Sequence, residues 1–228
     1  MMFGGFQKLT LLDYPGKVAC LLFTQGCNFR CPFCHNASLV RGGEGEKISD
    51  TEIIEYLKKR SKVLDGVCIS GGEPLLHSGL KEFIKEVRAL GYAIKLDTNG
   101  SFPEKLIELI SEGLIDYVAM DIKNSFDRYS ETAGVDTDIE KIKTSIDFLM
   151  NGNIEYEFRT TLVKELHTLS DMESIGKTIQ GAKRYYLQNF LDSGDILCQN
   201  LTPFDAETLH EMQKIALKYV SEVQIRGI

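Results

Sequence analysis

Three closely spaced cysteines are the residues of this chain best suited to chemistry. Cys27, Cys31 and Cys34 follow the pattern C-x3-C-x2-C, whereas the other three cysteines are scattered. Three thiolates on one short segment can bind one face of a metal centre, and an iron-sulfur cluster held by three cysteines leaves one iron without a protein ligand. That iron can coordinate a substrate or a cofactor. A structural zinc site with His35 as fourth ligand and a chance cluster of free thiols are the alternatives.

Further polar motifs follow apolar segments of the chain, where strands would end. In chain order they are Gly71-Gly72-Glu73-Pro74, Asp97-Thr98-Asn99-Gly100, Asp121-Ile122-Lys123 and Gln188-Asn189. In α/β proteins, ligands bind where the carboxyl ends of the strands meet the loops. We therefore expect these motifs to share one rim with the cysteine segment.

The elements that position these motifs are strands alternating with helices. Short apolar, β-branched runs predict strands over Val18–Gln25, Gly66–Ser70, Ala93–Asp97, Tyr117–Lys123, Glu155–Val163, Arg184–Phe190 and Ser221–Arg226. Apolar residues at helical spacing predict helices over Thr51–Val63, Leu80–Leu90, Pro103–Glu112, Ile139–Met150 and Ala206–Lys218. Asp50 and Pro103 are the expected helix starts, and Gly91 and Gly113 the expected stops.

This alternation predicts an α/β fold with a parallel sheet and right-handed crossovers. Six or seven strands are too few for a complete eight-stranded barrel, which leaves a partial barrel or a doubly wound sheet. No linker rich in Ser, Gly or Pro divides the 228 residues, so we expect one domain over residues 1–228.

Charge, apolar segments and cysteine use limit the classes of protein to which this chain can belong. A net charge of −7 argues against broad binding to nucleic acid or to anionic membranes. No signal peptide and no apolar run of about 20 residues is apparent, so we expect a cytoplasmic protein. Clustered cysteines in a reducing compartment more often bind metal or do redox chemistry than form disulfides. Cys20, Cys68 and Cys198 are expected to be small buried hydrophobic residues on or near strands.

The cysteine motif and the Gly-Gly-Glu-Pro motif together resemble those of the radical S-adenosylmethionine (SAM) superfamily. The resemblance implies that Cys27, Cys31 and Cys34 hold a 4Fe-4S cluster whose open iron is chelated by SAM. It also implies a partial (β/α)6 barrel of parallel strands, the radical SAM core.

The same resemblance implies roles for residues of the rim. Gly71, Gly72, Glu73 and Pro74 would meet the methionine amino group, and Phe33 would pack near the adenine unless it is a core aromatic residue. The ribose would be contacted by Asp97, Thr98 and Asn99. These residues and Asp121 would also bind a monovalent cation. Alternatively, the Asp97 motif could be a plain strand end with a helix cap. Lys123 would lie near the cofactor, or else form a surface ion pair. Arg159 would also lie near the cofactor, or else pair with a core carboxylate. Gln188 or Asn189 would read the adenine.

Over nearly its whole length the chain resembles the glycyl-radical activating branch, from Phe6 through Asp13-Tyr14-Pro15-Gly16 to Gln224-Ile225-Arg226-Gly227. This implies reductive cleavage of SAM to a 5'-deoxyadenosyl radical that abstracts hydrogen from a glycine of a partner enzyme. The implied partner is anaerobic ribonucleoside-triphosphate reductase, the electron donor a flavodoxin or ferredoxin, and Asp13 a residue that places the glycine loop. A pyruvate formate-lyase-type activase, a radical SAM enzyme acting on a small molecule, and a zinc-binding interaction module are the alternatives.

Overall fold

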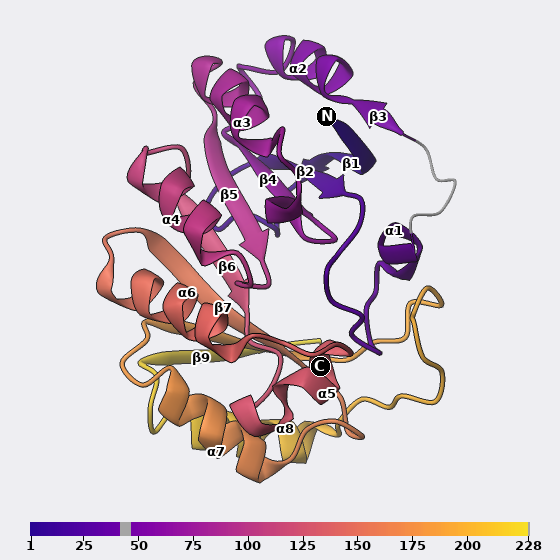
Figure 1. The fold of residues 1–228 in the computed structure, drawn as a ribbon, viewed down its shortest axis with the longest axis vertical. Helices are drawn as coiled ribbons and strands as arrows, with labels where there is room; N and C mark the ends of the chain where they lie inside the picture. Colours follow the sequence, from indigo (N-terminus) through magenta and orange to yellow (C-terminus); the bar gives the residue numbers. More distant parts are fainter. Residues whose placement is uncertain (42–46, 228) are drawn as a thin grey trace. The chain divides into compact units, whose positions relative to one another are not determined.

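The computed structural model describes residues 1–41 and 47–227 of the chain (Figure 1). The chain forms two compact units. Unit 1 comprises residues 1–28, 38–98 and 102–119, and unit 2 comprises residues 29–37, 99–101 and 120–228. The chain therefore passes between the units five times, once within strand β6 (Tyr117–Asp121).

The strands of unit 1 form a sheet with the order β3-β1-β2-β4-β5-β6. Strands β2 (Ala19–Thr24), β4 (Gly66–Gly71) and β5 (Ala93–Thr98) are parallel neighbours. Strand β1 (Met2–Thr10) pairs antiparallel with β2 and with the short β3 (Ile48–Ser49). This antiparallel edge differs from the expected all-parallel sheet. The sequence does not predict β1, because this strand contains two glycines and buries only Phe3 and Thr10.

Helices α2 (Asp50–Lys58), α3 (Leu80–Ala89) and α4 (Pro103–Ser111) connect the parallel strands, and η1 (Pro74–Leu76) follows β4. Ser49, and not the expected Asp50, is the N-cap of α2. Its hydroxyl accepts from the Glu52 backbone N–H while the Glu52 carboxylate accepts from the Ser49 N–H, which is a capping box. Pro103 begins α4, as expected.

In unit 2 the strand order is β6-β7-β8-β9, with β7 (Glu155–Leu162), β8 (Arg184–Asn189) and β9 (Glu222–Arg226) parallel. The helices of this unit are η2 (Phe126–Arg128), α5 (Tyr129–Ala133), α6 (Ile139–Asn151), α7 (Leu169–Thr178) and α8 (Ala206–Ala216). Helix α1 (Ala37–Arg41) begins in unit 2 and continues in unit 1. Strands β3 and β9 are the first and last strands of the sheet order. The sheet is therefore open and not closed into a barrel.

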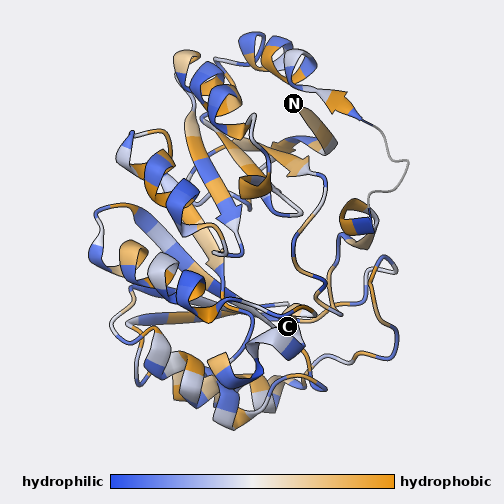
Figure 2. Cartoon of the chain, in the orientation of Figure 1, coloured by the Kyte–Doolittle hydropathy of each residue, from blue (hydrophilic) through white to orange (hydrophobic). Residues whose placement is uncertain are grey.

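Apolar side chains explain why these elements pack. Figure 2 shows hydrophilic and hydrophobic residues interspersed along the helices, and the buried residues of α3 are Leu80, Phe83, Ile84 and Val87, at helical spacing. The parallel strands of unit 1 are almost continuously buried, as β4 is from Gly66 to Ile69, whereas the edge strand β9 buries only Val223. The fold is thus the expected α/β arrangement with a mostly parallel, open sheet.

Within the described residues, no helix has the length and apolar character of a membrane span.

Candidate functional site

The segment bearing the three cysteines runs without helix or strand from the end of β2 to α1. Cys27 belongs to unit 1, and Cys31 and Cys34 belong to unit 2. In unit 2 the segment is fixed by backbone hydrogen bonds, from Arg30 N–H to the Ala133 carbonyl (2.8 Å) and from Cys34 N–H to the Cys31 carbonyl (3.0 Å). These bonds fix the backbone that carries Cys31 and Cys34.

Cys31 is 7% exposed, and burial raises the pKa of its thiol to about 11, an effect that the nearby Lys123 ammonium partly opposes. A buried thiol loses its proton when a metal ion coordinates it. His35, the alternative zinc ligand, stacks on Phe190 with the ring centroids 5.7 Å apart.

The two glycines at the end of β4 bring the backbone against the end of β2. Gly71 has a φ of +109°, and a Cβ added at Gly72 would lie 1.8 Å from the Gly26 carbonyl oxygen. The N–H of Gly72 donates to the Thr24 carbonyl and that of Glu73 to the Gly26 carbonyl, both at 2.9 Å. The Gly-Gly-Glu-Pro motif therefore lies directly beside the residue that precedes Cys27.

Glu73 is completely buried, and its carboxylate Oε1 accepts from the Thr98 hydroxyl (2.9 Å) and from the Leu75 N–H (3.0 Å). The structure thus brings together residues from two of the predicted motifs. Asn99 and Gly100 belong to unit 2. The Asn99 side-chain oxygen accepts from the N–H and the hydroxyl of Ser101, forming a local turn rather than the helix cap considered above; Phe102 is the N-cap of α4.

Asp97 lies at the end of β5, where its two carboxylate oxygens have different partners. Oδ2 accepts from the Ser70 hydroxyl (3.0 Å), and Oδ1 accepts from the Lys95 ammonium. Lys95 is 2% exposed. Lys95 belongs to none of the sequence motifs, but a lysine within an apolar strand, two residues before Asp97, is a signal that could have indicated a role for it.

In unit 2, Asp121 lies between two cationic side chains. Arg159 Nε donates to Oδ1 (2.8 Å) and Lys123 Nζ to Oδ2 (3.1 Å). Burial would raise the pKa of Asp121, but Arg159 and Lys123 outweigh it and lower the pKa to about 2. The same carboxylate raises the pKa of Lys123 against the effect of burial. Both cations therefore do pair with a carboxylate, and the Lys123 side chain is only 14% exposed, so its pair is not a surface one.

Phe33 is buried, with the ring of His167 at 6.5 Å. His167 is 3% exposed, hydrogen-bonds the Lys123 carbonyl through Nε2 (2.8 Å), and has a pKa lowered by burial. No motif surrounds His167 in the sequence, so only the fold reveals that it supports the backbone at Lys123.

Gln188 and Asn189 end strand β8. The Asn189 amide bonds both backbone groups of Phe204, donating to the carbonyl and accepting from the N–H, each at 3.0 Å. Asn189 therefore anchors the segment before α8. Of the scattered cysteines, Cys20 and Cys68 are buried as expected, but Cys198 is exposed, because it lies in a stretch that forms neither helix nor strand.

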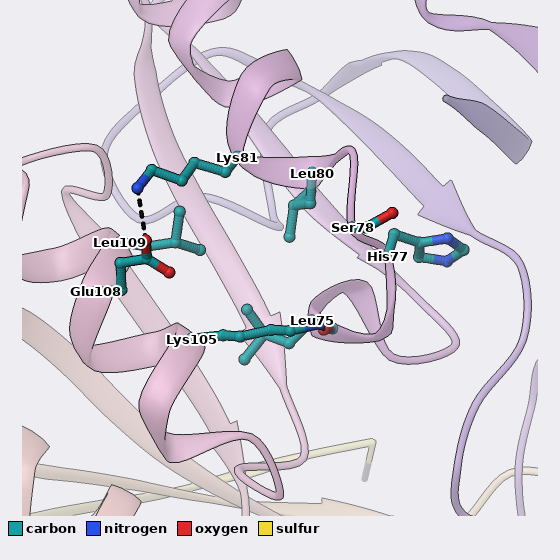
Figure 3. A pocket seen from close by; sticks show the side chains of 8 residues that line it. All are labelled: Leu75, His77, Ser78, Leu80, Lys81, Lys105, Glu108 and Leu109. Atoms are coloured by element: carbon teal, nitrogen blue, oxygen red, sulfur yellow. Dashed lines mark hydrogen bonds and ion pairs between the residues drawn. The ribbon is translucent and has the colours of Figure 1, made fainter.

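A small pocket of unit 1 lies next to η1 (Figure 3). Its volume is about 110 Å³, well below the roughly 300 Å³ and more of ordinary ligand pockets. Lys105 Nζ donates to the Leu75 carbonyl at 2.6 Å, and Lys81 pairs with Glu108. None of the predicted cofactor residues is among the eight described residues that line it.

Residues 21–176 match the sequence model of the protein family described as the radical SAM superfamily, and they make up more than half of the chain. The chain belongs to the radical SAM superfamily. The protein is therefore a radical SAM enzyme, and its cofactors are a 4Fe-4S cluster and SAM. The thiols of the cysteine segment, the glycines that let the backbone approach, and the carboxylates of Glu73 and Asp97 are a donor set that fits these groups.

Three known proteins are similar to this chain in sequence or in fold. A "Putative glycyl-radical enzyme activating enzyme" of Methanocaldococcus jannaschii is 37% identical, over 98% of this chain and 95% of that protein. The pyruvate formate-lyase-activating enzyme of Listeria monocytogenes is 35% identical over 51% of each chain. The crystal structure of a radical SAM methyltransferase from Sphaerobacter thermophilus has the same fold, with a TM-score of 0.75, 14% identity, and coverage of 96% of this chain and 68% of that one.

Proposed function

We propose that this radical SAM enzyme activates a glycyl-radical enzyme by abstracting hydrogen from a glycine of that partner. The observation that carries the proposal is the 37% identity to the "Putative glycyl-radical enzyme activating enzyme" over nearly the full length of both chains. The similarity to a pyruvate formate-lyase-activating enzyme over half of the chain supports the same class of reaction.

When bound, the cluster and SAM supply one-electron cleavage of the sulfonium to methionine and a 5'-deoxyadenosyl radical. In the proposed site Cys27, Cys31 and Cys34 hold the cluster. Glu73 accepts a hydrogen bond from the methionine ammonium, for which a buried carboxylate is suited. Gly71 and Gly72 supply backbone without side chains where the cofactor must come close.

The remaining rim residues orient SAM in this proposal. Asp97, Thr98 and Asn99 face the ribose, and Phe33 covers the adenine, together with the amide of Gln188 or Asn189. Lys123 and Arg159 act through Asp121, which they hold ionised. The burial of Phe33 and the ion pairs of Asp121 support these roles.

The proposed partner is anaerobic ribonucleoside-triphosphate reductase, and the proposed electron donor is a flavodoxin or ferredoxin. Support for this partner is the resemblance that runs from Phe6 through Asp13-Tyr14-Pro15-Gly16 to Gln224-Ile225-Arg226-Gly227. The turn at this motif is formed in unit 1, with the Lys17 N–H donating to the Tyr14 carbonyl at 3.2 Å. A protein partner is also consistent with the net charge of −7, which disfavours nucleic acid.

The test is anaerobic reconstitution of the cluster. The cluster is then reduced with a chemical reductant in the presence of SAM and the candidate reductase. We expect 5'-deoxyadenosine together with a doublet glycyl signal in electron paramagnetic resonance. Cleavage of SAM without a glycyl signal on this reductase or on pyruvate formate-lyase would refute the activase proposal and favour a small-molecule substrate.

A further inference from the structure

Lys95 is a buried cation on strand β5 that pairs with a carboxylate of its own strand. It lies two residues before Asp97, and alternate residues of a strand point to the same face of the sheet. The side chains of Lys95 and Asp97 are 2% and 12% exposed, and Lys95 Nζ donates to Asp97 Oδ1. A charge this deeply buried is stable only when it is paired.

The surroundings in unit 1 hold this pair in one place. The Cys68 sulfur lies 3.9 Å from both Lys95 Nζ and Asp97 Oδ1, and the Ser70 hydroxyl donates to Asp97 Oδ2 at 3.0 Å. The ring of Tyr117 lies 6.0 Å from Lys95 Nζ, at the outer limit of a cation–π contact. Cys68 and Ser70 come from β4, the parallel neighbour of β5, so the ammonium and carboxylate are fixed by two strands.

The second acidic residue expected to bind a monovalent cation has the same kind of partner. In unit 2, Asp121 accepts from Arg159 and from Lys123, at 2.8 Å and 3.1 Å. A monovalent cation binds to carboxylates because it neutralises them, and a cationic side chain already bonded to the carboxylate repels it. Neither carboxylate therefore fits the expected role of a ligand to a monovalent cation.

We propose that Lys95 supplies at Asp97 the positive charge expected from a monovalent cation, so that SAM binding does not depend on sodium or potassium ions. The inference rests on the proposed function in that Asp97 is taken as a cofactor-binding residue. Lys95 acts through Asp97 and is a positioning residue.

The first test uses the wild-type protein with its reconstituted, oxidised cluster. SAM is titrated calorimetrically in sodium, potassium or tetramethylammonium chloride at equal ionic strength, about 0.1 M. We expect dissociation constants that agree within about threefold in the three salts. A larger loss of affinity in tetramethylammonium, restored by sodium or potassium, would overturn the proposal.

Substitution of Lys95 provides the second test. In Lys95→Met the carboxylate of Asp97 loses its cation, and we expect SAM affinity about tenfold lower in tetramethylammonium, with recovery of most of the loss in sodium or potassium. Lys95→Arg keeps a positive charge and should remain independent of the salt. A loss in Lys95→Met that is equal in all three salts, or no loss, would contradict the proposal, because a purely structural role would not create a dependence on cations.

Lys81→Met is the matched control, because Lys81 pairs with Glu108 and Glu112 at a more exposed position of the same unit. It should bind SAM like the wild type. If Lys95→Met does not fold, the wild-type titration and Lys95→Arg still decide the question. The titrations need no protein partner, so absence of a glycyl radical would refute the proposed activase function and leave this inference standing.

Discussion

Cys31 is the cysteine of the motif whose surroundings are best defined, since it is buried and has the Lys123 ammonium nearby. Cys31→Ala removes one of three thiolates, and we expect loss of the bound iron and of visible thiolate-to-iron absorption. Cys198→Ala, at the exposed cysteine of the same unit, is the control and should keep both. Iron content and absorption after reconstitution measure the difference, and a Cys31→Ala protein that retains a full cluster would refute the ligand assignment.

Glu73 combines complete burial with a charge, which requires partners. Glu73→Gln keeps the shape but removes the charged acceptor for the methionine ammonium. We expect SAM affinity to fall roughly 10- to 100-fold, as for loss of a charge-assisted hydrogen bond. Titration of the reconstituted protein measures this. Glu82→Gln, on the exposed face of α3, should bind normally, and equal affinity of both variants would contradict the role of Glu73.

Asp171 is a residue whose ionisation stabilises the fold away from the proposed site. Its side chain is 8% exposed and accepts hydrogen bonds from Thr168, Ser125 and Arg128. Burial would raise the pKa of Asp171, but the bonds from Thr168 and Ser125, with the charge of Arg128, lower it below its ordinary value of 3.8. A lowered pKa gives stability that is present above the ordinary pKa and is lost as the pH falls through the lowered one.

We therefore expect Asp171→Asn to reduce the free energy of unfolding by roughly 1–3 kcal/mol at about pH 7, and by much less at about pH 3. Denaturant unfolding of both proteins at the two pH values measures the difference. Asp127→Asn, at a neighbouring exposed position, should match the wild type at both. A difference between wild type and Asp171→Asn that stays constant with pH would show that ionisation is not its cause.

At the scale of elements, the sequence predicted the parallel strands and the longer helices because their apolar residues repeat at clear intervals. The seven expected strands and five expected helices are present, with ends that differ by up to five residues. Strand β1 and helix α7 were not predicted. Only two residues of β1 are buried, and α7 buries Asp171 and Gly176 beside Met172 and Ile175, so neither shows a regular apolar pattern.

The candidate site was predictable to the extent that its residues form motifs. Cysteine spacing and the glycine pair indicated the cofactors, and the contact between Glu73 and Thr98 confirms that two motifs meet. The partners of those residues were not predictable, because pairs such as Lys123 with Asp121 and Arg159 with Asp121 depend on which faces of the strands point inward. The same applies to His167, whose role depends on the loop that carries it.

The turn between β4 and η1 depends on Gly72, because its backbone lies against Gly26. Gly72→Ala would place Cβ 1.8 Å from the Gly26 carbonyl oxygen, so the bond from the Glu73 N–H to that carbonyl must break. We expect a loss of roughly 2–4 kcal/mol of stability and poorer incorporation of the cluster.

Gly79→Ala is the matched control for Gly72→Ala, because its Cβ would meet its nearest neighbour at 3.6 Å, an ordinary contact. It should change stability by no more than about 1 kcal/mol, the scale of an N-cap substitution. Thermal unfolding and iron content measure both variants. Gly72→Ala with normal stability and a full cluster would contradict the claim that this close approach positions the cysteine segment.

At the scale of the whole molecule, the chain connects its two units repeatedly rather than by one linker. Strand β6 contributes residues to both, and the cysteine segment has Cys27 in one unit and Cys31 and Cys34 in the other. One domain over residues 1–228 stays a prediction, and this connectivity supports it.

In the proposed reaction, the protein takes a hydrogen atom from a glycine of a partner enzyme. The most direct measurement uses the candidate reductase labelled with deuterium at its glycines, mixed with the reduced protein and SAM. We expect one deuterium in the 5'-deoxyadenosine, found by mass spectrometry, and a glycyl radical on the reductase. Unlabelled 5'-deoxyadenosine, formed at the same rate with and without the reductase, would contradict it.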